Sequence, residues 1–265
     1  MGRPKQWVEK CISPGIYEVE ISSWKYFSAY ILNEMLDYRG YIWRGHLCHD
    51  WKLEPTLDRI LRKNNKPLNN LSIRNKHLEN FKYAARGRRG INPPILKNDN
   101  DWWALGQHNG LATPLLDWSA SPFVAAYFAY ADECIEQGNR RAIYALTTYE
   151  ISKKCREILK NHKGESRADI VEFIKPLSDE NHRLVNQGGM FTRSPDGEDV
   201  ESWIKRHFDS KEIDIYILIK LILPESDREL ALKTLNRMNI NHLTLFPDLY
   251  GASKYCNTDL KIKSY

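Results

Sequence analysis

The sequence predicts a single α+β domain in which a split antiparallel or mixed β core is flanked by helices. The clearest strand lies at residues 213–223, where every odd position is apolar and Pro224 ends the run. The clearest helix lies at residues 123–134, because Ser121 is a good N-cap and Pro122 suits the first helical position. No repeat, linker or low-complexity tract interrupts the 265 residues, so we expect one domain.

The first half of the chain contains several further helical patterns. The spacing of apolar residues predicts an amphipathic helix over residues 24–38. A short strand is expected at residues 41–45, ending in a glycine turn. Two more helices are predicted at residues 57–62 and 72–86, separated by a polar loop, and another helical turn begins at the tryptophan pair 102–103.

The second half alternates between strand and helix signals. A strand is predicted at residues 143–147 and is followed by a helix-rich middle. Residues 183–192 have a strand-like pattern that contains two adjacent glycines. The last helix is expected over residues 226–238, and its first four residues have capping-box spacing.

Composition limits the classes of protein to consider. The chain is 42% hydrophobic and 28% charged, as in ordinary globular proteins. It has no run of eighteen apolar residues, so no membrane span is expected. The N-terminus lacks the apolar segment of a secretory signal, which favours a cytoplasmic location. Five widely spaced cysteines form no C-x-x-C pair, so we expect neither a disulfide framework nor a metal site.

The net charge of +5 is unevenly distributed along the chain. Four basic residues gather within eight positions and are accompanied by two glycines; they are Lys82, Arg86, Arg88 and Arg89. One interpretation is a solvated helix end and loop. The other is a surface that contacts the phosphate backbone of RNA or DNA.

Several blocks of the sequence resemble the FRG family, which is named for an aromatic-Arg-Gly motif. The first is Trp43-Arg44-Gly45, and the densest runs from Gln107-His108 through Asp117-Trp118-Ser119 to Ala129. Weaker blocks occur at residues 51–55, 187–192 and 245–249. The resemblance divides the chain into an N-terminal helical segment at 1–39, an FRG domain at 40–255 and a C-terminal tail at 256–265.

Two departures from the family pattern stand out. Trp43 replaces the usual Phe or Tyr and preserves the aromatic bulk. Pro114 stands where the family usually has an arginine, so any ligand contact of that arginine is absent here or is made by a neighbour.

The family is similar to divergent relatives of the ADP-ribosyltransferase fold. The resemblance therefore implies an enzyme that uses NAD as its substrate and transfers a glycosyl group. It also implies a toxin of an antiphage toxin–antitoxin system, with nucleic acid as acceptor and an antitoxin protein as partner.

The resemblance and the local chemistry together give a set of candidate site residues. Arg44 is expected to bind the NAD diphosphate with forked hydrogen bonds, or else to be a structural arginine paired with Asp117 or with a carbonyl. Trp118 is expected to stack on a base or to be core, and Ser119 either contacts the ligand or caps a helix. Asp117 itself either acts in catalysis or only stabilises the helix dipole.

The remaining candidates lie in glycine-containing segments. Gln107 and His108 precede a turn, where His108 would bond a ribose hydroxyl or have no role. Gln187 would position the ribose or the acceptor. No acid occupies position 187, so the carboxylate that an oxocarbenium-like state requires is expected from Asp117, or from Glu198 or Glu201 in the following loop.

A second hypothesis is a non-catalytic module that senses a nucleotide or binds nucleic acid. The absence of a well-placed glutamate favours it. A nuclease is disfavoured, because no cluster of Asp, Glu and His has metal-binding spacing.

Overall fold

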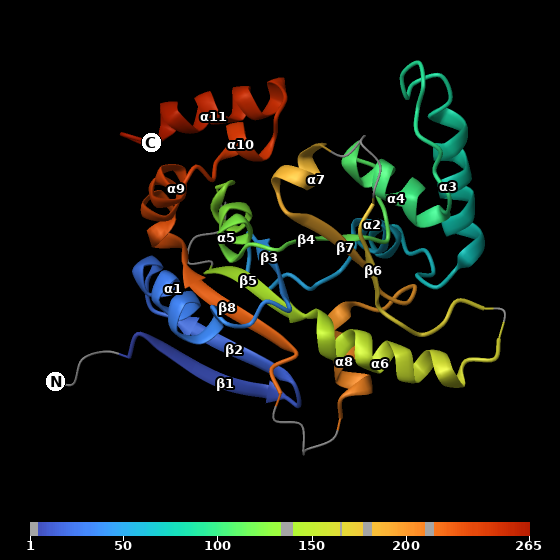
Figure 1. The fold of residues 1–265 in the computed structure, drawn as a ribbon, viewed down its shortest axis with the longest axis horizontal. Coiled ribbons are helices and arrows are strands. Elements are labelled where there is room, and N and C mark those ends of the chain that lie inside the picture. The colour runs from blue at the N-terminus through green and yellow to red at the C-terminus, as the bar shows by residue number, and fades with distance from the viewer. Residues whose placement is uncertain (1–4, 134–139, 165, 177–181, 210–214) are drawn as a thin grey trace.

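In the computed structural model, which describes residues 5–133, 140–164, 166–176, 182–209 and 215–265, the chain forms one mixed β-sheet with helices on both faces (Figure 1). The eight strands found there have the spatial order β1-β2-β8-β5-β3-β4-β7-β6, and all neighbours are antiparallel except β2 and β8, which are parallel. The strands are β1 (Trp7–Ser13), β2 (Ile16–Ile21), β3 (Tyr41–His46), β4 (Leu116–Ser119), β5 (Arg140–Thr147), β6 (Glu172–Ile174), β7 (Gly189–Arg193) and β8 (Leu218–Pro224). The predicted α+β class with a mixed core is confirmed.

The helices agree with most of the predicted positions. They are α1 (Trp24–Tyr30), a π-helical turn η1 (Ile31–Met35), α2 (Thr56–Lys63), α3 (Leu71–Ala84), α4 (Asp99–His108), α5 (Pro122–Tyr130), α6 (Thr148–Asn161), α7 (His182–Asn186), α8 (Val200–His207), a 3-10 turn η2 (Glu225–Asp227), α9 (Arg228–Arg237), α10 (His242–Leu245) and α11 (Leu249–Lys261). The Ser121 side chain accepts a hydrogen bond from the backbone N–H of Val124, so the predicted N-cap of α5 is confirmed. The helix ends at Tyr130, before the predicted end at Cys134, and Cys134 itself lies outside the described residues. None of the described helices has the length and apolar character that crossing a bilayer requires.

Three predicted boundaries differ from the structure. Residues 1–39 are not simply helical, because β1 and β2 form a hairpin ahead of α1. Residues 256–265 are not a separate tail, because α11 runs to Lys261 and the side chains of Ile262 and Tyr265 are buried. Residues 183–192 are not one strand: α7 and a turn precede β7.

Two further predictions are corrected near the C-terminus. The strand predicted from Ile213 begins only at Leu218, and Ile213 itself lies outside the described residues. The helix predicted to be the last one is α9, which α10 and α11 follow, and the capping box predicted at its start does not form. Instead the Asp227 carboxylate accepts a hydrogen bond from the backbone N–H of Trp24, at 2.6 Å, and so serves the start of α1.

The sheet is buried on both faces, as the side chains of β5 show. Ile143 and Ala145 point into a core made with α1, α5 and α9. Their neighbours Tyr144 and Leu146 point into a second core made with α6 and α8. This two-sided burial explains why β5 is apolar at consecutive positions rather than at alternate ones.

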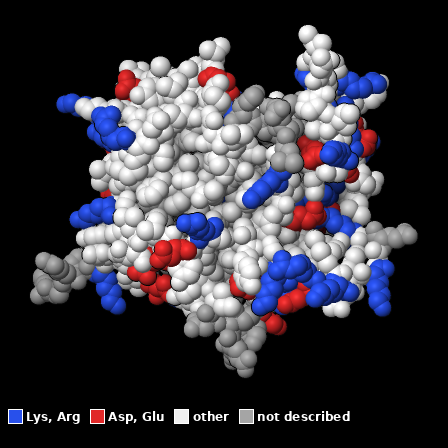
Figure 2. Space-filling view, viewed as in Figure 1, with Lys and Arg blue, Asp and Glu red and all other residues white. Residues whose placement is uncertain are grey.

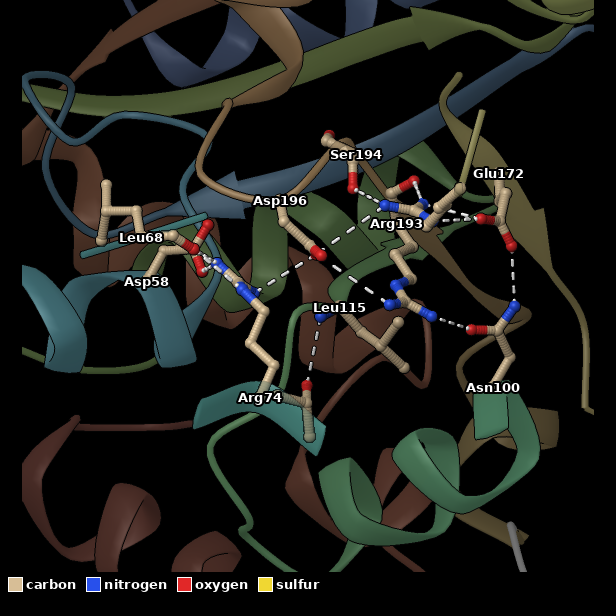
Figure 3. Close-up of polar contacts among 11 residues, drawn as sticks. Asp58, Leu68, Arg74, Asn100, Leu115, Glu172, Arg193, Ser194 and Asp196 are labelled. Atoms are coloured by element: carbon tan, nitrogen blue, oxygen red, sulfur yellow. Dashed lines mark hydrogen bonds and ion pairs between the residues drawn. The ribbon is translucent and has the colours of Figure 1, made fainter. Parts of the chain in front are cut away.

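A network of buried charges anchors the helices α2 to α4 beside the β6–β7 end of the sheet (Figure 3). Arg74 of α3 donates to Asp58 of α2 at 2.5 Å and lies 3.5 Å from Asp196, which follows β7. Arg193 of β7 donates to Asn100 of α4 at 2.8 Å. Because Arg74 and Asp58 are almost fully buried, removing one of these two side chains would leave the charge of the other inside the protein without its nearest partner.

Candidate functional site

A pocket of about 470 Å³ lies where β3 and β4 separate. The two strands pair only at Trp43↔Ser119, and α5 closes the pocket with Ala125 and Phe128. The pocket is lined by seven residues that the sequence analysis assigned to catalysis or to NAD binding, namely Arg44, Gln107, His108, Asp117, Trp118, Ser119 and Gln187. Segments separated by more than a hundred residues in sequence therefore meet in one pocket.

Arg44 spans the gap between the two strands. Its Nη1 donates to the backbone carbonyl of Asp117 at 2.7 Å and lies 3.6 Å from the Asp117 carboxylate. The side chain is 20% exposed, and its Nη2 makes no hydrogen bond within the described residues. Both sequence interpretations of Arg44 are therefore compatible with its position, because it pairs with Asp117 and still presents one free donor nitrogen to the pocket.

The His46 imidazole holds the Arg44 guanidinium in place through a hydrogen bond. The Nε of Arg44 donates to His46 Nε2 at 3.0 Å, and because arginine has no acceptor, that imidazole nitrogen must be unprotonated. The proton therefore sits on Nδ1, which lies 3.3 Å from the carbonyl of Trp51. Burial and the charge of Arg44 lower the pKa of His46 from 6.5 to about 3, so the ring is neutral near pH 7.

The Asp117 carboxylate lines the pocket and is open to solvent. Its side chain is 55% exposed, and its Oδ2 accepts a hydrogen bond from the Gln107 side-chain amide at 2.7 Å. The Thr113 hydroxyl donates in turn to the carbonyl oxygen of the Gln107 side chain. Thr113 and Gln107 thus fix the direction of the carboxylate and leave it open to solvent.

Trp118 and Ser119 are largely occupied by contacts within the protein. The Trp118 indole is 3% exposed and donates to the Thr192 hydroxyl at 2.8 Å. The Ser119 hydroxyl donates to the carbonyl of Gln187 at 2.7 Å and accepts from the backbone N–H of Ser121 at 3.0 Å. Ser119 is therefore not the helix cap, and both residues form the wall of the pocket and offer little to a ligand.

One segment of the chain that contributes to this pocket matches a known family of domains. Residues 39–137 match the model of the FRG domain. The chain carries an FRG domain. The search of curated proteins and the search of solved structures each found no match.

The FRG match covers β3 to α5 and ends before the blocks at 187–192 and 245–249, so it is shorter than the expected range of 40–255. Gly45, the glycine of the FRG motif, lies inside β3 and not in the expected turn. A Cβ atom at this position would lie 2.0 Å from the Ala125 carbonyl oxygen and 2.5 Å from the Ala129 nitrogen. The glycine therefore allows α5 to lie directly on β3.

Gln187 and His108 differ from the expectation in their local setting. Gln187 lies in a turn after α7, and its side-chain amide donates to the carbonyl of Leu245 at 3.2 Å. Gly188 in this turn has a φ of +54°, which favours glycine. His108 is the last residue of α4 and not part of a loop.

Three basic side chains in the pocket were missed by the sequence analysis: Lys52, Arg59 and Arg183. Arg59 follows the FRG block 51–55 by one helical turn and donates to the Thr56 hydroxyl. Arg183 precedes Gln187 by four residues, but it is paired with Asp248 at 2.5 Å. Arg59 and Lys52, unlike Arg183, have no carboxylate partner among the described residues. In the sequence, Arg59 could have been found only from its position just after the FRG block 51–55.

Glu198 and Glu201, two alternatives for the catalytic acid, do not line the pocket. Glu198 is paired with Arg206 at 2.5 Å and Glu201 with Lys205 at 2.6 Å. Asp117 is therefore the best placed of the three carboxylates considered for charge stabilisation.

The predicted nucleic-acid-binding residues lie at the end of α3 and in the loop after it, outside the pocket lining. Lys82 is paired with Glu79 and Asp99, and Arg86 stacks on Tyr83 with its guanidinium carbon 3.8 Å from the ring centroid. Arg88 donates to the carbonyl of Ala84 and Arg89 to that of Pro94. In Figure 2 basic and acidic groups are interspersed along the edges of the face shown, with no continuous positive surface.

Proposed function

We propose that the pocket between β3 and β4, called the FRG pocket from here on, binds NAD as a substrate and that the chain transfers ADP-ribose to nucleic acid. The observation that carries the proposal is the meeting of Arg44 and Asp117. A guanidinium with one free donor and an exposed carboxylate lie 3.6 Å apart in a pocket of about 470 Å³. A guanidinium is well suited to bind a diphosphate, and a carboxylate is well suited to stabilise a sugar cation.

Each charged group has a distinct task in this proposal. Arg44 and Arg59 hold the diphosphate, and Arg59 takes the part of the family arginine replaced by Pro114. The bond between the ribose C1′ and the nicotinamide nitrogen breaks, and nicotinamide leaves with the bonding electrons. The Asp117 carboxylate stabilises the positive charge that develops on the ribose. A nucleophile of the acceptor then bonds to C1′ and loses its proton to solvent.

Nucleic acid as the acceptor, and a toxin role restrained by an antitoxin, belong to the same proposal. They are supported by the FRG match and by the four basic residues at the end of α3 and in the loop after it. Because Lys82 is already paired with two carboxylates, we expect Arg86 and Arg88 to make most of the phosphate contacts.

Adenylate-labelled NAD tests the proposal directly. The protein is incubated with labelled NAD and with RNA, DNA or protein, and released nicotinamide is measured in parallel. We expect label transfer in the wild type and a loss of at least about a hundredfold in Arg44→Ala and Asp117→Asn. The matched controls are Arg156→Ala and Asp259→Asn, which change exposed residues of α6 and α11. Retained transfer in both pocket variants would contradict the proposal.

A non-catalytic module is the second candidate. It is favoured by Gln187, an amide that is bound to a carbonyl where a catalytic acid was expected. In that case calorimetry detects NAD binding that Arg44→Ala weakens, while no nicotinamide is released from the wild type.

A further inference from the structure

A second pocket, of about 210 Å³, lies between the N-terminal hairpin, the π-helical turn η1 and the start of β8. It shares no lining residue with the FRG pocket. Its volume is below the ~300–1,000 Å³ of sites for drug-sized molecules, so it fits a small group.

The walls of this second pocket are mainly aromatic. Five rings line it, and they come from four separate segments of the chain: Trp7, Tyr30, Tyr38, Tyr41 and Tyr216. Trp7 meets Tyr30 edge to face with ring centroids 5.5 Å apart, and Tyr38 meets Tyr41 in the same way at 6.3 Å. The hydroxyl of Tyr41 donates to the backbone carbonyl of Tyr216. These contacts hold rings at different angles around one space.

The charge of the second pocket is entirely negative. Two carboxylates line it, those of Glu9 and Glu34, while no lysine, arginine or histidine does so among the described residues. Glu9 accepts a hydrogen bond from the Tyr216 hydroxyl at 2.5 Å. Glu34 is exposed and makes no hydrogen bond or ion pair within the described part of the chain.

The local structure explains why these side chains converge. Trp7 and Glu9 are two residues apart on β1, so they point to the same side of the sheet. Tyr30 and Glu34 are four residues apart on α1 and η1, so they lie on one side of that helix. Burial, followed by the negative charge of Glu9, raises the pKa of Tyr30, so its ring stays neutral and hydrophobic.

We propose that this second pocket is an aromatic cage that binds an alkylated ammonium group, either of a small quaternary amine or of a methylated lysine side chain. Aromatic faces attract cations, and quaternary ammonium groups suit such cages because their charge is spread over methyl groups that need no hydrogen-bond acceptor. Glu9 and Glu34 complement the positive charge at the rim.

Choline and its neutral carbon isostere, 3,3-dimethyl-1-butanol, form the first test by isothermal titration calorimetry. They have the same shape, so only the charge distinguishes them. We expect saturable binding of choline and binding of the alcohol that is weaker by roughly fivefold or more. Equal affinity for the two compounds, or no binding of choline and of the peptide described below, would overturn the proposal.

Variants of Tyr38 link the binding to the cage, because this ring is 63% exposed and its replacement should not disturb folding. Tyr38→Leu should weaken choline binding roughly fivefold to thirtyfold, whereas Tyr38→Phe should stay within about twofold. The matched control is Tyr83→Leu, an exposed tyrosine outside the pocket. An unchanged affinity in Tyr38→Leu would overturn the assignment.

The source of the ammonium group is decided by competition. A peptide carrying trimethyl-lysine is titrated alongside the unmodified peptide, each with and without choline. Competition by the modified peptide alone identifies a methylated protein, while choline binding without such competition identifies a small quaternary amine. Asp117→Asn should change neither result, since Asp117 belongs to the FRG pocket.

Discussion

His46 shows how a single buried side chain fixes the chemistry of its neighbour. Its Nε2 accepts the hydrogen bond from Arg44 Nε, so protonation of His46 would place two positive charges face to face. Burial is the larger cause, and together with the charge of Arg44 it lowers the pKa of His46 to about 3. The unfolded chain does not share these constraints, and its histidines keep a pKa near ~6.5.

This difference predicts that acid destabilises the protein through His46. The folded pKa lies below the unfolded value, so between pH 6.5 and about 3 the unfolded state binds the extra proton. The free energy of unfolding should therefore fall as pH drops through this window, by up to about 1.4 kcal/mol per pH unit. Urea denaturation at several pH values measures the slope.

A matched variant separates His46 from other titrating groups. His46→Gln keeps a side chain that can accept from Arg44 but does not titrate, so its slope should be smaller than that of the wild type. His162→Gln, which changes a histidine outside the FRG pocket, is the matched control for the substitution itself. Identical slopes in the wild type and in His46→Gln would show that this histidine is not the cause.

The residue scale is also where the sequence predicted the site best. Arg44, Asp117 and Gln187 were expected to converge, and they line one pocket. His46 escaped notice although it is two residues from Arg44 on the same strand face. Its tautomer and its burial depend on the carbonyl of Trp51 and on the Tyr144 ring, 5.0 Å away, and local sequence does not reveal such contacts.

At the scale of elements, the packing of α5 on β3 depends on the absence of a side chain at Gly45. The φ angle of Gly45 is not positive, so other residues could adopt its backbone conformation. A side chain is excluded there by lack of space, since a Cβ atom would lie 2.0 Å from the Ala125 carbonyl oxygen. The backbone of a buried helix cannot move away without disturbing the core on its other side.

Gly45→Ala should therefore destabilise the fold by about 2 kcal/mol or more, as overpacking of a core does. Gly40→Ala is the control, because a Cβ atom there meets nothing within 4 Å and the φ of Gly40 is not positive. Urea denaturation of both variants measures the difference. A stability of Gly45→Ala equal to that of the control would refute the close approach of α5.

The predictions of element type succeeded where the signal was local. The Ser-Pro start of α5 depends only on adjacent residues and was predicted correctly. The capping box predicted at residues 226–229 does not form: the N-cap of α9 is Asp227, and its carboxylate bonds to the N–H of Trp24, which is 203 residues away. The N-terminal hairpin was missed, since β1 is largely exposed and lacks an apolar alternation.

At the scale of the whole molecule, the order of the strands could not be predicted. The sheet joins β2 to β8 in parallel, which links the N-terminal hairpin to a strand about two hundred residues later. Such pairings depend on which faces the helices cover, and not on the composition of either strand. The prediction of a mixed β core was correct as a class, but it did not include the order of the strands.

The same topology predicts how much of the chain is needed for folding. The FRG match covers residues 39–137 and contains only β3 and β4 of the sheet. These two strands share a single register pair, while β3 has six with β5 and β4 has four with β7. A fragment of residues 39–137 would thus lose nearly all of its strand pairing and expose Trp118, which donates to Thr192.

We expect this fragment to remain unfolded, because two short strands with one shared pair cannot bury their apolar faces. Circular dichroism and the dispersion of amide proton signals in NMR measure the outcome, with the 265-residue chain as the folded reference. The fragment should show collapsed amide dispersion and no cooperative urea transition. A dispersed spectrum from residues 39–137 alone would mean that the FRG segment folds without β5 and β7, and that the pocket between β3 and β4 does not depend on the rest of the sheet.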